Sequence, residues 1–295
     1  MKRVNKNKLV VVCVLSFFTA GLSISVTMAD TTANQVKARK DRLVKNHTVI
    51  KPRIVGGENA KKGRWDWAAA IAFDDSDGGL FQYCGGTLVS SEWVLTAAHC
   101  DVLVGDKVIL GRLDLTKSDG EVKEVIKVVY PKDVGLPAFN EDTNNHDLAL
   151  IKLSSRSALK PVPLIGASNK LSKPGTAATV IGWGLLEDSG EDTSDVLMQV
   201  TVPIISNDSC NAYYNLGGIS LTDNMICAGI NGKDSCQGDS GGGIFATDQQ
   251  TGKDHIVGIV SFGIGCALPE FPGVYTRVAN YTQWIVTVIG LNGGF

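Results

Sequence analysis

Short runs of apolar residues, interrupted at close intervals by Gly, Asp and Pro, dominate the chain after residue 53. Most of these runs are rich in Val, Ile, Thr and aromatic residues, a composition that favours β-strands. The clearest runs cover residues 68–73, 87–98, 107–111, 124–130, 147–153, 177–184, 200–205, 255–263 and 273–278. Many short strands separated by turn residues are typical of sandwiches and barrels, so the pattern predicts an all-β fold.

Two segments do not follow this pattern of short strand-like runs. The C-terminal segment 281–290 has the apolar spacing of a helix. Its apolar positions are Trp284, Ile285, Val288 and Ile289. The stiff stretch "LKPVPL" at 159–164 lies near the middle of the body. We predict that it crosses between two halves of about a hundred residues each.

The first 29 residues have the layout of a secretory signal peptide. Four basic residues within the first eight positions precede an apolar run from Leu9 to Ala20, and a Ser/Thr/Gly-rich stretch ends near Ala29. An uncleaved membrane anchor is the alternative, but the polar residues between positions 23 and 27 argue against it. We therefore expect a signal peptide over 1–29, a secreted protein (with periplasmic transit in a bacterial host) and no stable membrane association.

Charge is distributed unevenly along the 295 residues. Residues 1–53 hold eleven of the 28 Lys and Arg but only two of the 30 Asp and Glu, so residues 54–295 carry a net charge of −11. Such an acidic body argues against nucleic acid as a partner. The basic segment 30–53 is open to two interpretations, an RNA- or membrane-binding arm or, more commonly, a solvated leader.

Cysteine usage fits a secreted protein. Of seven cysteines, Cys13 falls within the signal segment, which leaves six. An even number in a secreted chain indicates three disulfides, with fifteen pairings open. Zinc binding is the competing interpretation, but the chain has no C-x-x-C pair and only one His beside a Cys, at 99–100. We therefore expect no metal and no cofactor.

Ser240 lies in the motif G-D-S-G-G. A nucleophile elbow of the α/β-hydrolase type would require an acid and then a histidine after the serine. The only later histidine, His255, lies inside a strand-like run, and alternating helices are missing from the pattern. The other interpretation takes His99 of "TAAHC" and Asp147 of "NNHDLALIKL" as upstream partners. An imidazole held by a carboxylate can accept a serine proton, so the order His–Asp–Ser predicts nucleophilic catalysis.

Residues 54–295 resemble the chymotrypsin-like serine peptidases, and their trypsin-like branch in particular, along essentially their whole length. The matching segments are "RIVGG" (53–57), "CGGTLVSSEWVLTAAHC" (84–100), "HDLALIKL" (146–153), "GWG" (182–184), "MICAG" (225–229), "DSCQGDSGG" (234–242), "SFGIGC" (261–266) and "PGVYTRV" (272–278). The resemblance implies two antiparallel six-stranded β-barrels with the site in the cleft between them. The implied division is an N-terminal barrel over about 54–160, a C-terminal barrel over about 161–280 and a C-terminal helix over about 281–290.

The resemblance also assigns catalytic roles. Ser240 becomes the nucleophile, His99 the general base and then acid, and Asp147 the group that orients the imidazole. The backbone N–H groups of Gly238 and Ser240 would form the oxyanion hole. The implied disulfides are Cys84–Cys100, Cys210–Cys227 and Cys236–Cys266.

Substrate contacts follow from the same resemblance. Asp234 matches the floor of the primary specificity pocket, where a buried carboxylate requires a cation, so the implied substrates are proteins or peptides with Arg or Lys before the scissile bond. Gly263 and Gly273 match the pocket walls. Ser261, Phe262 and Gly263 match the strand that pairs with the substrate backbone. Phe262 stands where the family usually has tryptophan. This difference bears on the preference for substrate residues two or more positions before the scissile bond.

The junction of Arg53 and Ile54 matches the family's activation site. Cleavage there would free the α-ammonium of Ile54 to pair with Asp239 and set the backbone around Ser240. Residues 30–53 are then an activation propeptide of a zymogen. The implied partners include an activating protease, for which the enzyme itself is a candidate because Arg53 suits its own pocket, and protein inhibitors.

Two further positions depart from the family pattern. Gly243 stands where proline is usual, and the sequence offers no reason for it. Arg112 occupies a position that is acidic in calcium-binding relatives, so we expect no calcium site. His146, just before Asp147, is interpreted as a strand flank. The alternative function is a non-catalytic binding homologue, because this fold also hosts inactive members, but the complete His–Asp–Ser set argues against it.

Overall fold

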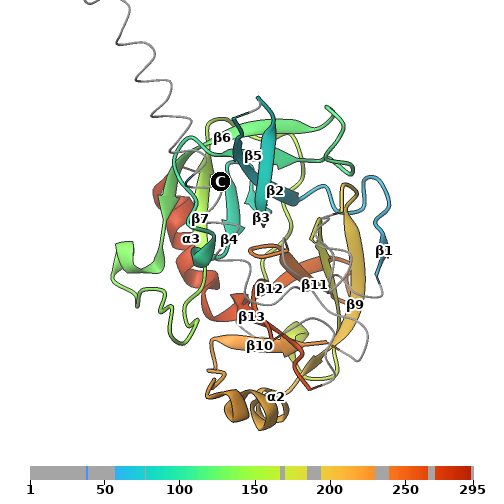
Figure 1. The fold of residues 1–295 in the computed structure, drawn as a ribbon, viewed down its shortest axis with the longest axis vertical. Helices are drawn as coiled ribbons and strands as arrows, with labels where there is room; N and C mark the ends of the chain where they lie inside the picture. Colours follow the sequence, from blue (N-terminus) through green and yellow to red (C-terminus); the bar gives the residue numbers. More distant parts are fainter. Residues whose placement is uncertain are drawn as a thin grey trace, which may run out of the picture.

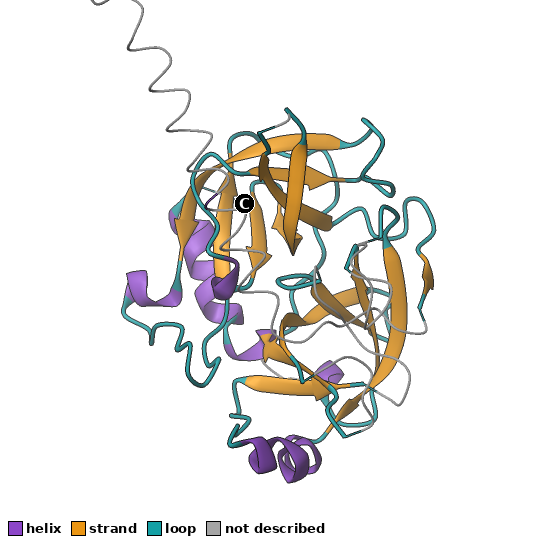
Figure 2. Cartoon of the chain, in the orientation of Figure 1, coloured by secondary structure: helices purple, strands orange, loops and turns teal. Residues whose placement is uncertain are grey.

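The structure is a computed structural model that describes six stretches of the chain and the isolated Ala38. The stretches are residues 57–76, 78–166, 170–184, 194–229, 239–264 and 270–293. Two antiparallel β-barrels pack against each other, and the few helices lie at their periphery (Figures 1 and 2). The predicted all-β class with two six-stranded barrels and a C-terminal helix is confirmed.

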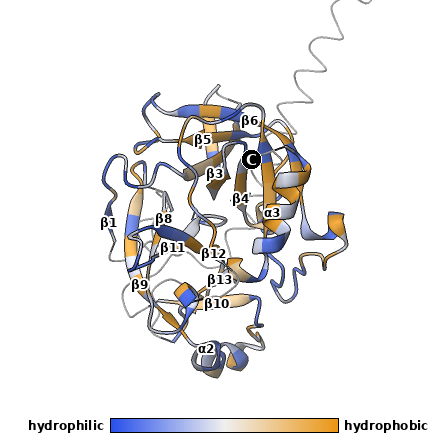
Figure 3. Cartoon of the chain, turned by 180° about the vertical axis from the view of Figure 1, so that it is seen from behind, coloured by the Kyte–Doolittle hydropathy of each residue, from blue (hydrophilic) through white to orange (hydrophobic). Residues whose placement is uncertain are grey.

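Six strands close the first barrel in the order β2-β3-β4-β7-β6-β5. They are β2 (Ala68–Asp74), β3 (Leu80–Ser90), β4 (Trp93–Thr96), β5 (Lys107–Leu110), β6 (Glu121–Val129) and β7 (Ala149–Leu153). Strand β6 turns one face to water, and its alternating polar and apolar residues form bands in Figure 3. A register shift between Val125 and Lys127 is a β-bulge, and it leaves Ile126 exposed.

Six further strands form the second barrel, in the order β9-β10-β13-β12-β11-β8, which closes through pairing of β8 with β9. They are β8 (Ala177–Gly182), β9 (Met198–Ile205), β10 (Met225–Ala228), β11 (Gly243–Thr247), β12 (Asp254–Phe262) and β13 (Gly273–Arg277). The short strand β1 (Glu58–Asn59) precedes the first barrel in sequence but pairs with β9 of the second. The start of the stretch 57–76 is therefore paired with the barrel that carries Ser240.

The described helices are few and short. They are α2 (Asn207–Tyr214), α3 (Thr282–Leu291) and the 3₁₀ turns η1 (Ala98–Cys100), η2 (Pro131–Val134), η3 (Lys170–Ser172), η4 (Asn215–Gly217) and η5 (Val278–Asn280). Helix α3 buries the four apolar residues that predicted it and lies beside β7 (Figure 1). In the part of the chain that the structure describes, no helix has the length and apolar character needed to cross a membrane.

Helix α2 was not predicted. Its eight residues are mostly polar and bury only Cys210 and Tyr214. The helix starts after Ser206, whose Oγ accepts a hydrogen bond from the N–H of Ser209 at 3.1 Å. A disulfide to Cys227 of β10 then holds it on the barrel.

Two of the three implied disulfides are confirmed. Cys84 bonds to Cys100 and Cys210 to Cys227. Cys236 and Cys266 lie outside the described residues. The first bridge joins β3 to η1 over a sequence separation of 16, for which the chain-entropy model gives about 3 kcal/mol of stabilisation.

The proline-rich segment 159–164 crosses between the barrels. The N–H of Val162 donates to the carbonyl of Leu88 in β3 at 3.0 Å. Two residues later, Leu164 forms a parallel bridge with Ile256 of β12. The boundaries near residue 160 stay a prediction, but the segment contacts one strand of each barrel.

An aromatic cluster fills part of the junction between the barrels. The rings of Trp65 and Trp67, which precede β2, lie 5.3 Å and 5.9 Å from the ring of Phe245 in β11. The ring of Phe245 occupies the space beside Gly243, where an added Cβ would lie 2.3 Å from the ring and 2.6 Å from Thr87 Oγ1. Any larger residue at 243 would overlap this ring, which accounts for a glycine where the sequence offered no reason for one.

Candidate active site

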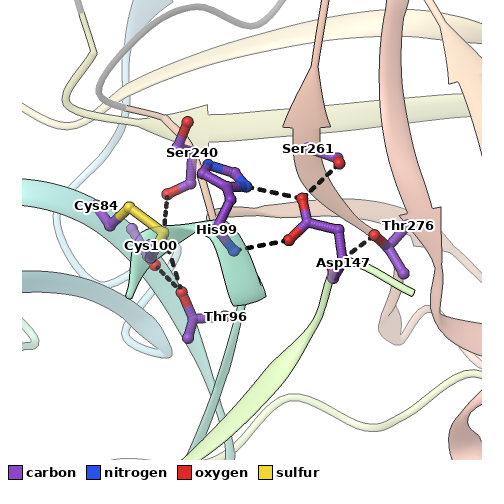
Figure 4. A network of polar contacts seen from close by, with 9 residues as sticks. Cys84, Thr96, His99, Cys100, Asp147, Ser240, Ser261 and Thr276 are labelled. Carbon is purple, nitrogen blue, oxygen red and sulfur yellow. Dashed lines mark hydrogen bonds and ion pairs between the residues drawn. A yellow bond between two sulfur atoms is a disulfide. The ribbon is translucent and has the colours of Figure 1, made fainter. Parts of the chain in front are cut away.

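The three predicted catalytic residues come from three separate loops at the junction of the barrels (Figure 4). His99 lies in η1, directly after β4, and Asp147 lies in the turn that leads into β7. Ser240 lies in the turn that leads into β11 of the second barrel. The fold therefore brings together side chains that are separated by 48 and 93 positions along the chain.

His99 and Asp147 are joined by two hydrogen bonds. The backbone N–H of His99 donates to Oδ1 of Asp147 at 2.9 Å, and Nδ1 of the imidazole lies 2.7 Å from Oδ2. The carboxylate is 1% exposed and the imidazole 22% exposed. A carboxylate at this distance holds the proton on Nδ1, so that Nε2 is the nitrogen that carries the acceptor lone pair.

The second barrel supports Asp147 with two hydroxyl groups that the sequence analysis did not assign to this task. Ser261 of β12 donates from Oγ to the Oδ2 of Asp147 at 2.5 Å. Thr276 of β13 donates to the Asp147 carbonyl oxygen at 2.6 Å. Asp147 of the first barrel is thus held by strands of the second, so its position depends on the docking of the two barrels.

The pKa values of the pair shift in opposite directions. Burial alone would lower the pKa of His99, but the charge of Asp147 and its hydrogen bond outweigh burial and raise it. Burial alone would raise the pKa of Asp147, but the charge of His99 and the hydrogen bonds lower it. The carboxylate stays ionised near neutral pH, and the imidazole titrates above its ordinary value.

The turn that carries Ser240 packs tightly against the first barrel. The Ser240 carbonyl accepts a hydrogen bond from the N–H of Gly85 at 2.7 Å. The next residue, Gly241, has a φ of 79°, and a Cβ there would meet Thr96 Oγ1 and the carbonyl oxygen of Gly85. Glycine is required at 241 both by conformation and by space. In Figure 4, Ser240 lies on the opposite side of the His99 ring from Asp147.

Asp239, which directly precedes Ser240, is completely buried. Its Oδ1 accepts a hydrogen bond from the N–H of Gly184 at 2.9 Å. The carboxylate also lies against Gly182, where a Cβ would overlap it. The "GWG" segment thus packs against the Asp239 carboxylate, and its first glycine provides the room.

The predicted substrate-binding residues within the described chain lie at the ends of two paired strands. Phe262 ends β12 and pairs with Val274 of β13, whose first residue is Gly273. Gly263 follows Phe262 and is exposed. The ring of Phe262 meets Tyr214 of α2 edge to face, with centroids 6.0 Å apart. The strand ends are therefore adjacent, and Phe262 is backed by a buried aromatic ring.

Several predicted residues lie outside the described part of the chain. They are the pocket residue Asp234, the oxyanion residue Gly238, the activation-site residues Arg53 and Ile54, and the segments 1–29 and 30–53 apart from Ala38. Their roles stay predictions.

One group of metal-ligand residue types occurs among the described residues: Cys84, His99 and Cys100. Both sulfurs belong to a disulfide, so they are not available as thiolate ligands. Arg112 occupies a position that is acidic in calcium-binding relatives. Its Nε donates a hydrogen bond to the Asp119 carbonyl oxygen at 2.7 Å. The guanidinium group therefore connects the two ends of the segment 112–119.

Comparison with known proteins agrees with the fold. The family model named Trypsin matches residues 54–285. The chain is 38% identical over 243 residues to "Trypsin I-P1" of Gallus gallus, covering 81% of this chain and 90% of the relative. It is 37% identical over 251 residues to "Serine proteinase stubble" of Drosophila melanogaster, covering 81% of this chain. The chain spans 32% of the length of that second relative.

The chain belongs to the trypsin-like branch of the chymotrypsin family of serine peptidases. The matched range includes every residue predicted for catalysis, the oxyanion hole and substrate binding.

Proposed function

We propose that this chain is a secreted serine endopeptidase, made as a zymogen, that hydrolyses peptide bonds after Arg or Lys. The observation that carries the proposal is the buried Asp147 carboxylate, which holds the Nδ1 side of His99 while Ser240 lies on the other side of the ring. Because the chain belongs to this family, proteins are the expected class of substrate.

The chemistry assigned to these residues proceeds through an acyl-enzyme. Ser240 Oγ attacks the carbonyl carbon of the scissile bond as its proton passes to Nε2 of His99. The imidazolium, stabilised by Asp147, then gives that proton to the departing amine. A water molecule repeats the sequence and releases the acid. Asp147 remains ionised throughout, in keeping with its lowered pKa.

The negatively charged oxygen of the tetrahedral intermediate would be bound by the N–H groups of Gly238 and Ser240. Each such donor contributes about 3 kcal/mol to transition-state stabilisation. Asp234 would bind the cationic side chain of the substrate, between walls that include Gly263 and Gly273. Phe262 would lie beside the residues that precede this side chain.

The proposal is tested with two acylating esters of the same leaving group, one with a guanidine-bearing acyl group and one with a small neutral acyl group. We expect both to form a covalent adduct on Ser240 in the activated protein, detected by intact mass. Asp234→Ser should slow acylation by the guanidine ester at least about 100-fold, because a cation loses its buried partner. Acylation by the neutral ester should be nearly unchanged.

The outcomes separate the parts of the proposal. Without an adduct from either ester, the chain would be a binding homologue and not an enzyme. Undiminished acylation by the guanidine ester in Asp234→Ser would refute the pocket assignment alone. Exposed Ser155 provides the matched control, because Ser155→Ala should acylate as the unmodified protein does while Ser240→Ala forms no adduct.

Activation is a second testable part of the proposal. Cleavage after Arg53 would release Ile54, whose ammonium group would pair with the buried Asp239 carboxylate, as the resemblance to the family implies. The purified Ser240→Ala precursor should remain uncut for days, and a trace of active enzyme should convert it, as N-terminal sequencing would detect. Conversion of the Ser240→Ala precursor without added enzyme would contradict autoactivation.

A further inference from the structure

The turn that carries Asp147 contains a second histidine that the catalytic roles leave unused. His146 directly precedes Asp147 and has a left-handed backbone with a φ of 61°. Asn144, two residues earlier, is left-handed as well, with a φ of 53°. Non-glycine residues are uncommon in this region, and they persist where surrounding contacts hold them. The contacts of this turn therefore bear on the position of Asp147.

One of these contacts comes from the start of helix α3. The Nδ1 of His146 lies within hydrogen-bond distance, 2.9 Å, of the Tyr281 hydroxyl oxygen. The two rings also meet edge to face, with centroids 6.1 Å apart. Tyr281 is 5% exposed and immediately precedes α3. The side chain before the catalytic acid is thus tied to a rigid, buried residue that follows the second barrel.

Asn145 anchors the same turn at a second point. Its Oδ1 accepts hydrogen bonds from Thr222 Oγ1 and Asn224 Nδ2, each at 3.1 Å. The same oxygen accepts the backbone N–H of His146 at 3.1 Å. Thr222 and Asn224 lie just before β10 of the second barrel. The turn is therefore held from two sides by elements that the first barrel does not supply.

The charges around the turn suit a positioning role. Burial, followed by the charge of Asp147, raises the pKa of Tyr281, so its hydroxyl stays protonated at every pH where such an enzyme works. Burial lowers the pKa of His146, so this imidazole is neutral at neutral pH. A neutral pair beside Asp147 holds the turn without introducing a cation that competes with His99 for the carboxylate.

We propose that His146 and Tyr281 form a clamp that positions Asp147 against His99. Both are positioning residues, since they act through Asp147 and not on substrate. The catalytic consequence rests on the proposed function, whereas the positioning itself concerns only the His99–Asp147 pair. When the clamp is removed, the left-handed turn relaxes, the carboxylate holds the imidazole less well, and His99 binds its proton less tightly.

The direct test is the titration of His99 by NMR. The chain has only four histidines, so their resonances are assignable by single substitutions. Tyr281→Phe removes the hydroxyl and keeps the ring, and His146→Asn removes the imidazole but tolerates a left-handed backbone. In a Ser240→Ala background we expect each change to lower the proton affinity of His99 about two- to fivefold. With Ser240 restored, kcat should fall by a similar factor and KM should stay the same.

A matched control is available in the second barrel. His255 of β12 also uses Nδ1, which lies 3.1 Å from the carbonyl oxygen of Leu164, far from the Asp147 turn in sequence. His255→Ala should leave the titration of His99 unchanged, even where it lowers the melting temperature. The double variant of His146→Asn and Tyr281→Phe should be no worse than the more severe single one, because both remove the same contact.

The clamp is refuted if Tyr281→Phe lowers stability without moving the titration of His99. It is also refuted if the two single effects multiply in the double variant. If the clamp variants shift the titration of His99 but the protein with Ser240 intact turns over no substrate, the clamp is supported. Only the proposed catalysis is then contradicted. The two inferences therefore fail by different observations.

Discussion

Asp147→Asn is expected to lower kcat about 10⁴-fold while the protein remains folded. The carboxylate accepts from Nδ1 of His99 and so leaves Nε2 able to take a proton from Ser240. An amide in the same place can donate from its NH₂ group to Nδ1, which favours the tautomer with the proton on Nε2. That tautomer cannot accept the serine proton, so the nucleophile is no longer activated. The measurement is kcat at a pH above the raised pKa of His99.

The same substitution should change how activity depends on pH. Catalysis needs a neutral His99, so activity is lost as the pH falls through the pKa of this group, which in the native chain lies above 6.5. In Asp147→Asn the charge that raises this pKa is gone, and burial then lowers it. The acid limb of the residual activity should therefore move to lower pH. An unchanged acid limb would mean that Asp147 does not carry the charge that His99 senses.

A second buried aspartate provides the control. Asp106 is 3% exposed, and its Oδ2 accepts hydrogen bonds from the Tyr83 hydroxyl at 2.7 Å and from the N–H of Leu103 at 2.8 Å. Asp106→Asn should cost stability comparable to the Asp147 change but leave kcat within about twofold, because both donors still find an amide oxygen. If Asp147→Asn keeps more than a tenth of the native kcat, its assignment as the catalytic acid is wrong.

The parts of the site that depend on short stretches of sequence were predictable. Short apolar runs rich in Val, Ile and aromatic residues located most strands, because many of the strands are buried along nearly their whole length. His99, Asp147 and Ser240 each stand in a motif, and the order of the three motifs indicated the family. The pairing of His99 with Asp147 was therefore expected before any distance was known, and the structure places their side chains 2.7 Å apart.

The support of Asp147 was not predictable in the same way. Ser261 and Thr276 lie 114 and 129 positions further along the chain, and small hydroxyl residues in strands give no sign of their partners. Ser261 was interpreted only as part of the substrate strand, and Thr276 was not singled out. Helix α2 was missed because eight mostly polar residues with two buried side chains are too few for a periodic signal. These features arise from docking of the barrels and from a disulfide, not from local preference.

Gly243→Ala should lower the free energy of unfolding by about 2–3 kcal/mol, the upper range for overpacking a buried site. The added methyl group would lie 2.3 Å from the ring of Phe245, which is wedged against Trp65 and Trp67. The φ of Gly243 is not in the left-handed region, so the cost is steric and not conformational. The melting temperature should fall by about 4–10 °C, measured in a Ser240→Ala background that prevents self-cleavage.

The steric origin of this cost is tested by shortening the ring. Phe245→Val is itself destabilising, because it leaves a cavity between the barrels. In that background Gly243→Ala should cost little, because the ring atoms that it would meet are gone. The Thr87 hydroxyl has no hydrogen-bond partner among the described residues, so no such bond to them opposes its turning away. A coupling energy of about 1–3 kcal/mol is therefore expected between the two sites. Full additivity of the two substitutions would show that glycine is required at 243 for a reason other than the ring of Phe245.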